Sequence, residues 1–152
     1  MKNILTTIFA LSSVIGYGQI EISNLTSDSS RYTILKLEDV SSSLFENCEN
    51  SNLTDLDFQK MENILKACIS NYNQNISIFD IPIDLSRYKR QYVAVINKKG
   101  EKVIWINCFY SNAFDKWKTE VVHVNDGGNC FFNIKINLTT GKYYEFYVNG
   151  ES

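Results

Sequence analysis

The chain has 152 residues, of which 44% are hydrophobic and 21% charged, and 15 basic against 17 acidic residues leave a formal charge of −2. This composition excludes a disordered, collagen-like or coiled-coil protein and is typical of one globular domain. The balanced charge gives no reason to expect a nucleic acid as partner. One proline and seven glycines leave no room for a flexible linker between domains.

Residues 1–18 have the pattern of a secretory signal peptide. Lys2 is their only charged residue, an apolar run follows over 4–15, and small residues precede the expected cleavage after Gly18. The run is too short for a membrane span, which takes about 20 apolar residues. We therefore expect a periplasmic or secreted protein, with no stable membrane span after cleavage and a single domain over 19–152.

Four cysteines lie in the expected mature chain. Because an exported protein meets an oxidising compartment, disulfide bonds are the default interpretation. None has the Cys-x-x-Cys spacing of a zinc ribbon or a redox pair. The sequence leaves the pairing open; it favours a bridge from helix to sheet through Cys68 and argues against joining Cys108 to Cys130, which the expected sheet places two strands apart. The disulfide candidates are Cys48, Cys68, Cys108 and Cys130.

The first half of the chain predicts one strand and one helix. Residues 31–38 are a strand candidate. Further on, Thr54 fits an N-cap, and Asp55 and Asp57 fall in the first turn, where carboxylates favour the helix dipole. Apolar residues then recur at steps of three and four, which predicts an amphipathic helix over about 54–73. Its apolar stripe consists of Phe58, Met61, Leu65, Cys68, Ile69 and Tyr72.

From residue 91 onward the apolar pattern changes from the helical period to alternation, which predicts strands. The expected strands are 91–97, 101–110, 119–126, 129–138 and 143–149. Three x-x-Gly loops keep the apolar residues of successive strands on one face if each loop has three residues. These loops are 98–100, 126–128 and 139–141. The first of them sets Val95 opposite Val103.

The expected fold is α+β, with one long helix packed on a five-stranded antiparallel meander over about 91–149. Strand 101–110 is apolar on both sides and should therefore lie centrally. We expect the segment 76–85 to cover its second face, and the rest of that face to be partly open to water.

The odd-numbered residues of the last three strands form the predicted binding face. The deduced register sets four pairs opposite each other: His123 and Phe131, Asn133 and Tyr147, Lys135 and Glu145, and Asn137 and Tyr143. Aromatic rings, amides and an ion pair suit contact with a glycan or protein of the cell envelope. A solvated sheet face is the alternative interpretation. The candidate binding residues are His123, Phe131, Asn133, Lys135, Tyr143, Glu145 and Tyr147.

The catalytic inventory is small. His123 is the single histidine, so sites that need two imidazoles are excluded. Its parity differs from that of Cys130, which argues against a Cys–His dyad. We assign no catalytic residue, metal site or cofactor. A small envelope hydrolase using carboxylates, and an inhibitory or structural subunit of an envelope complex, are the alternatives to a binding domain.

Two segments resemble small exported proteins of Bacteroidetes: YKRQYVAVINKKGEKVIWINCF (88–109) and DGGNCFFNIKINLTTGKYYEFYVNG (126–150). The leader that ends before Gln19 is similar to theirs too. The resemblance implies an envelope or extracellular location and no particular activity. The outline of a helix against a meander also resembles the cystatin-like arrangement. However, the Gln-x-Val-x-Gly loop of cystatin inhibitors is only partly matched at Gln91, because Val95 stands where the glycine belongs.

Overall fold

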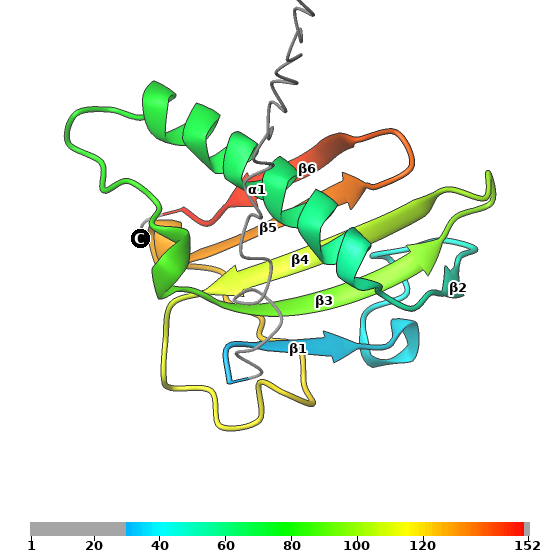
Figure 1. Ribbon diagram of the computed structural model, residues 1–152. Helices are drawn as coiled ribbons and strands as arrows, with labels where there is room; N and C mark the ends of the chain where they lie inside the picture. Colours follow the sequence, from blue (N-terminus) through cyan, green and yellow to red (C-terminus); the bar gives the residue numbers. More distant parts are fainter. Residues whose placement is uncertain (1–29, 151–152) are drawn as a thin grey trace, which may run out of the picture.

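The computed structural model describes residues 30–150 and consists of one long helix on a six-stranded sheet (Figure 1). The expected signal peptide, 1–18, lies outside the described residues. The strands and the helix are β1 (Tyr32–Leu35), β2 (Glu49–Asn50), α1 (Asp55–Asn75), β3 (Lys89–Ile96), β4 (Lys102–Phe109), β5 (Phe131–Asn137) and β6 (Lys142–Val148). Short 3-10 turns lie at Leu37–Asp39, Leu85–Arg87 and Gly128–Cys130. The α+β class is therefore confirmed.

The sheet is mixed rather than a pure meander. Its order is β1-β3-β4-β5-β6, with β2 also paired to β3. The pairs from β3 to β6 are antiparallel, whereas β1 runs parallel to β3. A parallel pair needs a long crossover connection, and here residues 36–88, which include α1, provide it. The expected strand at 31–38 exists as β1, but it extends the sheet beyond the predicted meander.

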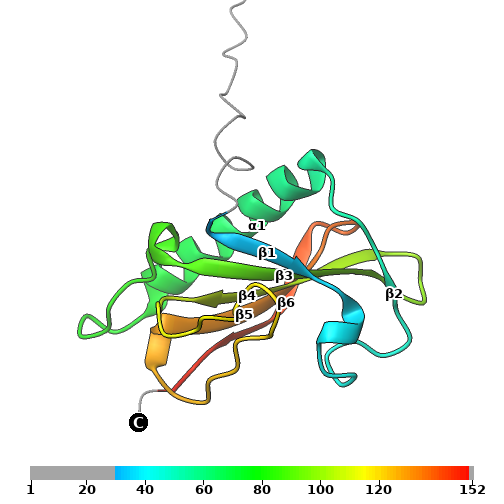
Figure 2. The same ribbon diagram turned by 90° about the horizontal axis from the view of Figure 1, so that it is seen from below.

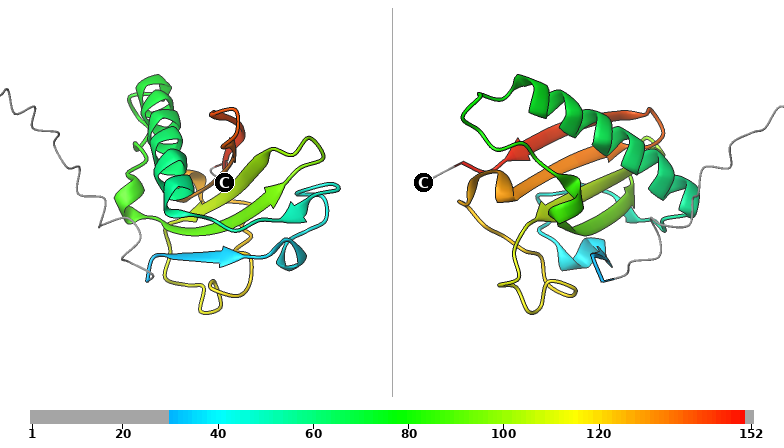
Figure 3. Two further views of the ribbon diagram at one scale, coloured as in Figure 1. Left: turned by 45° about the vertical axis from the view of Figure 1, so that its right-hand side comes forward. Right: turned by 60° about the vertical axis from the view of Figure 1, so that its left-hand side comes forward.

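Helix α1 begins where the sequence predicts. The Asp57 amide donates to Thr54 Oγ1 over 3.2 Å, and the Thr54 amide donates to Asp57 Oδ2 over 2.9 Å. This reciprocal pair satisfies two backbone donors that the first turn of a helix leaves unpaired. The helix crosses one face of the sheet, which we call the inner face (Figures 1 and 3).

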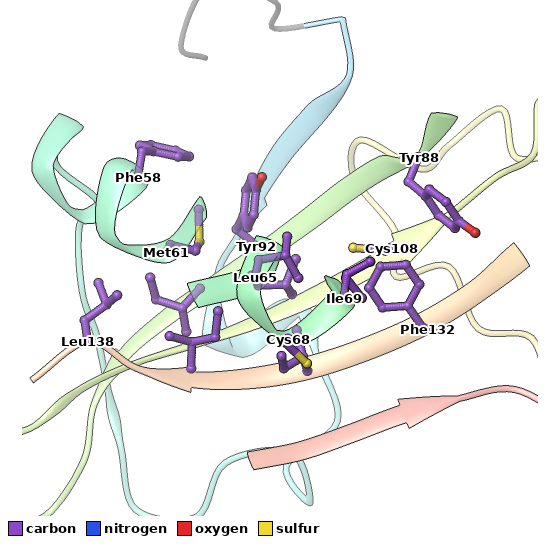
Figure 4. Packing of buried hydrophobic residues seen from close by; sticks show 14 of the residues in the cluster. Phe58, Met61, Leu65, Cys68, Ile69, Tyr88, Tyr92, Cys108, Phe132 and Leu138 are labelled. Atoms are coloured by element: carbon purple, nitrogen blue, oxygen red, sulfur yellow. The ribbon is translucent and has the colours of Figure 1, made fainter. Parts of the chain in front are cut away.

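The apolar stripe of α1 meets the even-numbered residues of the strands in the inner core (Figure 4). Met61 and Leu65 have no exposed surface, and the same holds for Ile104, Ile106, Ile134 and Ile136 beneath them. Each fully buried aliphatic side chain stabilises the fold by about 1.5–3 kcal/mol relative to an exposed one. The predicted apolar stripe of the helix is thus buried, and so is the even-numbered face of β5. Val122 and Val124, which were predicted on the same face, pack in a separate cluster instead.

The other side of the sheet, which we call the outer face, is covered by loops (Figure 2). Val93, Val95, Val103 and Trp105 pack there against hydrophobic residues of the segment 37–48. A further cluster joins Phe109 to Trp117 and Val122 of the loop 110–127. Strand β4 lies centrally, as expected. The expectation that the segment 76–85 covers its second face was wrong. The segment 76–85 follows the end of α1 instead, and Ile78 and Phe79 in it are 92% and 90% exposed.

The predicted strand at 119–126 does not exist, and β4 pairs directly with β5. Val122 and Val124 do alternate toward an apolar cluster, which produced the strand-like pattern. Their backbone is held by side chains instead of by a ladder: the Val122 amide donates to Gln91 Oε1, and its carbonyl accepts from Asn107 Nδ2. The alternating pattern therefore correctly predicted that these valines pack in an apolar cluster, but wrongly predicted that residues 119–126 pair as a strand.

The three glycine loops have different outcomes. The loop 98–100 is confirmed, with Val95 opposite Val103 and Gly100 at a φ of +74°. The loop 126–128 joins no pair of strands, so its predicted hairpin is wrong. After β5 the connection has four residues, which shifts the register by one, and a bulge at Glu145, with φ +49°, restores it.

The four cysteines are separate thiols in the structure, so any disulfide stays a prediction. The argument against a bridge between Cys108 and Cys130 fails, because β4 and β5 are neighbours rather than two strands apart. Burial raises the pKa of the Cys108 thiol to about 12. The Cys68 thiol, on the sheet side of α1, has a hydrogen bond with the Tyr143 side chain.

Candidate functional site

Four of the predicted binding residues lie around one hollow on the outer face. His123, Phe131, Asn133 and Tyr147 line a cavity of ≈ 160 Å³, which we call the amide pocket. Three further asparagines and an indole complete much of its wall: Asn107, Asn125, Asn149 and Trp105. The pocket thus combines amide groups with aromatic rings.

Strand register builds the floor of the amide pocket. Asn107 on β4 lies opposite Asn133 on β5, and Asn133 lies opposite Tyr147 on β6. Because directly opposite residues share a face, their side chains form a row across three strands. On the other side Gln91 of β3 pairs with Asn107 and lengthens the row. On β3 and β4 this polar row lies beside apolar residues of the same face, among them Val93, Trp105 and Phe109.

The buried part of this row fastens the pocket wall. Gln91 Nε2 donates to the carbonyls of Trp117 and Glu120, over 2.6 and 2.7 Å. Asn107 Nδ2 donates to Gln91 Oε1 over 3.0 Å. Asn149, the residue after β6, acts in the same way: its Nδ2 donates to the carbonyl of Val124 over 2.6 Å and to that of Asp126. The loop that carries His123 is therefore held at both ends by amide side chains.

The outer part of the row faces solvent. Tyr147 is 58% exposed and Asn133 is half-buried. The Asn133 side chain makes no hydrogen bond with any residue of the range 30–150. An amide can donate and accept at once, so Asn133 offers both functions to a ligand. His123, on the exposed loop, stands at the same pocket.

The remaining predicted binding residues lie elsewhere. Lys135 Nζ and Glu145 Oε2 form the expected ion pair at 2.7 Å, although the shifted register sets Tyr144 rather than Glu145 opposite Lys135. Lys135 also lies 5.2 Å from the centre of the Phe45 ring. The placement of Tyr143 on the outer face was wrong: it pairs with Ile136 and contacts Cys68 beneath α1. Tyr144 takes its place.

His123 does not oppose Phe131 in a ladder, because residues 119–126 are a loop. The two residues nevertheless meet at the amide pocket. Of the pocket residues that the sequence analysis left out, Asn107 had a visible signal. It is the only polar residue between Val103 and Phe109, in a strand that is apolar on both faces. Asn149 had no such signal.

Three carboxyl groups near the surface accept hydrogen bonds from neighbouring groups. Hydrogen bonds hold the pKa values of Glu38, Asp84 and Glu101 below their usual range. In the part of the chain that the structure describes, no group of three or more His, Cys, Asp or Glu residues is placed to hold a metal ion.

Comparisons of the chain with protein-family models, with curated proteins and with solved structures find no match. The class is therefore stated from the structure itself: an α+β domain whose mixed sheet carries a helix on the inner face and loops with an amide-lined pocket on the outer face. Within residues 30–150, no helix is long and apolar enough to cross a membrane.

Proposed function

We propose that the protein is an exported, non-catalytic binding domain and that it binds a glycan through the amide pocket. The row of Asn107, Asn133 and Tyr147 carries this proposal, because its outer members are accessible while its inner members are fixed. Support for export comes from the signal-peptide pattern at residues 1–18. The partner belongs, on this proposal, to the cell envelope or its surroundings.

A carbohydrate fits the chemistry of the pocket. Sugar hydroxyls donate and accept hydrogen bonds, and so do asparagine side chains. Tyrosine and tryptophan add flat apolar surfaces with a polar tip, against which the C–H face of a sugar ring packs. With a volume of ≈ 160 Å³, the pocket suits a single ring or branch, and exposed Tyr147 suits the unit next to it.

Binding to an array of bacterial envelope glycans tests the proposal, followed by titration with the best ligand. The double variant Asn133→Ala/Tyr147→Ala should bind at least about tenfold more weakly, because each lost hydrogen bond or ring contact is worth about 1 kcal/mol. Its thermal midpoint should change little, since both side chains face solvent. Tyr144→Ala, on the same strand and face but outside the pocket, is the matched control.

Two results contradict the proposal. One is an array without any bound glycan. The other is a glycan that the double variant binds as tightly as the unchanged protein does. If no glycan binds and a protein is captured instead, with capture lost in the double variant, the face is a protein interface and the glycan assignment is wrong.

A further inference from the structure

A second cavity lies on the inner face, away from the amide pocket. It measures ≈ 330 Å³ and is walled by β1, the first half of α1, the turn at 85–87 and the start of β3. We call it the basic pocket. Phe58 of α1 and Tyr92 of β3 project toward each other at this end of the inner core (Figure 4). The proposed glycan site makes no use of it.

Three aromatic rings from three elements form one wall of the basic pocket. The ring centre of Tyr32 lies 5.7 Å from that of Phe58 and 5.9 Å from that of Tyr92. Phe58 and Tyr92 are 5.6 Å apart and nearly perpendicular. Such edge-to-face packing holds the rings in place. The wall therefore offers a rigid apolar surface to whatever enters.

Positive charge predominates in the basic pocket, although the chain as a whole is slightly acidic. Arg31, Lys66 and Arg90 line it, against the single carboxylate of Glu62. That carboxylate is already paired with Arg90, and the two side chains are only 4% and 14% exposed. Arg31 and Lys66 have no carboxylate partner among residues 30–150. The net charge of the lining favours an anion.

Arg90 also has a donor without an acceptor. One terminal nitrogen pairs with Glu62, and the other donates to the Leu85 carbonyl over 3.3 Å. Its Nε is buried and makes no hydrogen bond to any residue of the described part. Buried donors in folded proteins are almost always paired, so this one needs an explanation. Arg90 therefore keeps part of its hydrogen-bonding capacity unused among residues 30–150.

We propose that the basic pocket binds a small organic carboxylate with an apolar body. Arg31 and Lys66 receive the carboxylate, while Arg90, already paired with Glu62, adds positive charge to the lining. The rings of Tyr32, Phe58 and Tyr92 receive the apolar part. A volume of ≈ 330 Å³ is at the lower end of the range for small-molecule sites. A strongly hydrated inorganic anion would contact the cations of this lining but not its aromatic rings.

Calorimetric titration with 3-phenylpropionate tests this site, with 3-phenylpropan-1-ol and inorganic phosphate as companion probes. We expect saturable binding of one carboxylate per chain, and at least about tenfold weaker binding of the alcohol and of phosphate. Hydrogen bonds to charged groups are strong enough for a difference of that size. The absence of saturable binding, or phosphate binding as tightly as the carboxylate, overturns the proposal.

Variants locate the bound carboxylate. Arg31→Gln/Lys66→Gln removes two cations at the rim and should weaken binding about tenfold or more. Lys36→Gln/Lys60→Gln changes the net charge equally at exposed positions outside the cavity and should leave affinity unchanged. If both double variants lost affinity for 3-phenylpropionate equally, the effect would reflect the net charge of the protein and not the basic pocket, and the proposal would be wrong. Asn133→Ala/Tyr147→Ala should bind 3-phenylpropionate normally, which separates this test from that of the glycan site.

Discussion

Gln91 shows how one residue can determine the path of a distant loop. Its side chain has no exposed surface and makes four hydrogen bonds: to the carbonyls of Trp117 and Glu120, to the amide of Val122 and to Asn107. Three of these partners are backbone groups of a loop without strand or helix structure. Such groups must be paired when buried, and here a strand side chain pairs them.

Replacing Gln91 should therefore destabilise the protein strongly. In Gln91→Leu the three backbone groups lose their partner, and unsatisfied buried groups cost about 1–3 kcal/mol each. We expect a loss of about 3 kcal/mol or more in the free energy of unfolding, measured by urea titration. Gln74→Leu, at an exposed position of α1, should change it by less than about 0.5 kcal/mol. Similar effects of the two substitutions would contradict the role given to Gln91.

The same residue explains a limit of the sequence analysis. Alternating valines at 122 and 124 correctly predicted burial, because burial depends on the residue's own side chain. Their hydrogen-bond partners are more than 10 positions away in sequence, at Gln91, Asn107 and Asn149, and no local pattern indicates them. The length of the connection after β5 was equally hidden: its four residues moved Tyr143 from the expected outer face to the inner one, and the bulge at Glu145 then restored the expected register.

At the scale of elements, the start of α1 was predictable and the partner of β4 was not. The helix start rests on Thr54 and Asp57, which are three residues apart. The pairing of β4 with β5 spans the connection 110–130, and its register follows from contacts of the whole sheet. A helix cap depends on residues close in sequence and can be recognised locally, whereas the order and register of strands depend on residues far apart in sequence.

Asp57 also links the two kinds of element. Its carboxylate caps α1 and forms an ion pair with Lys102 of β4, with Oδ2 and Nζ 2.8 Å apart. Burial by itself would raise the pKa of Asp57, but hydrogen bonds from Lys102 and Thr54 outweigh it and hold the pKa below the usual 3.8. A carboxyl whose pKa is lowered on folding stabilises the native state while it is ionised.

The pH dependence of stability checks this link. The contribution of Asp57 should be fully present above about pH 5 and should fade as the pH falls through 4 toward the lowered pKa. Asp57→Asn should cost about 1–2 kcal/mol at pH 7 and progressively less below pH 4. Asp55→Asn in the same turn, where Asp55 is exposed and has no ion pair with any described residue, should cost less at pH 7. A penalty for Asp57→Asn that is independent of pH would contradict the assignment.

At the scale of the whole molecule, one sheet serves two cores. Successive residues of β3 and β4 point to opposite faces, and nearly all are buried on both. Ile104 and Ile106 support α1, while Val103 and Trp105 between them support the outer loops. If either α1 or the outer loops unfolded alone, one full apolar face of β3 and β4 would be exposed to water. The two faces, and with them the two candidate pockets, should therefore be stable only together.

Equilibrium unfolding with two probes tests this coupling. Trp105 and Trp117 both lie in the outer clusters, so tryptophan fluorescence reports on that layer. Circular dichroism at 222 nm is dominated by α1 on the inner face. If the sheet couples the layers, both signals should give one urea midpoint, as two-state unfolding requires. Fluorescence that changes at lower urea than the helical signal would mean that the outer loops, and the amide pocket with them, unfold while the inner core persists.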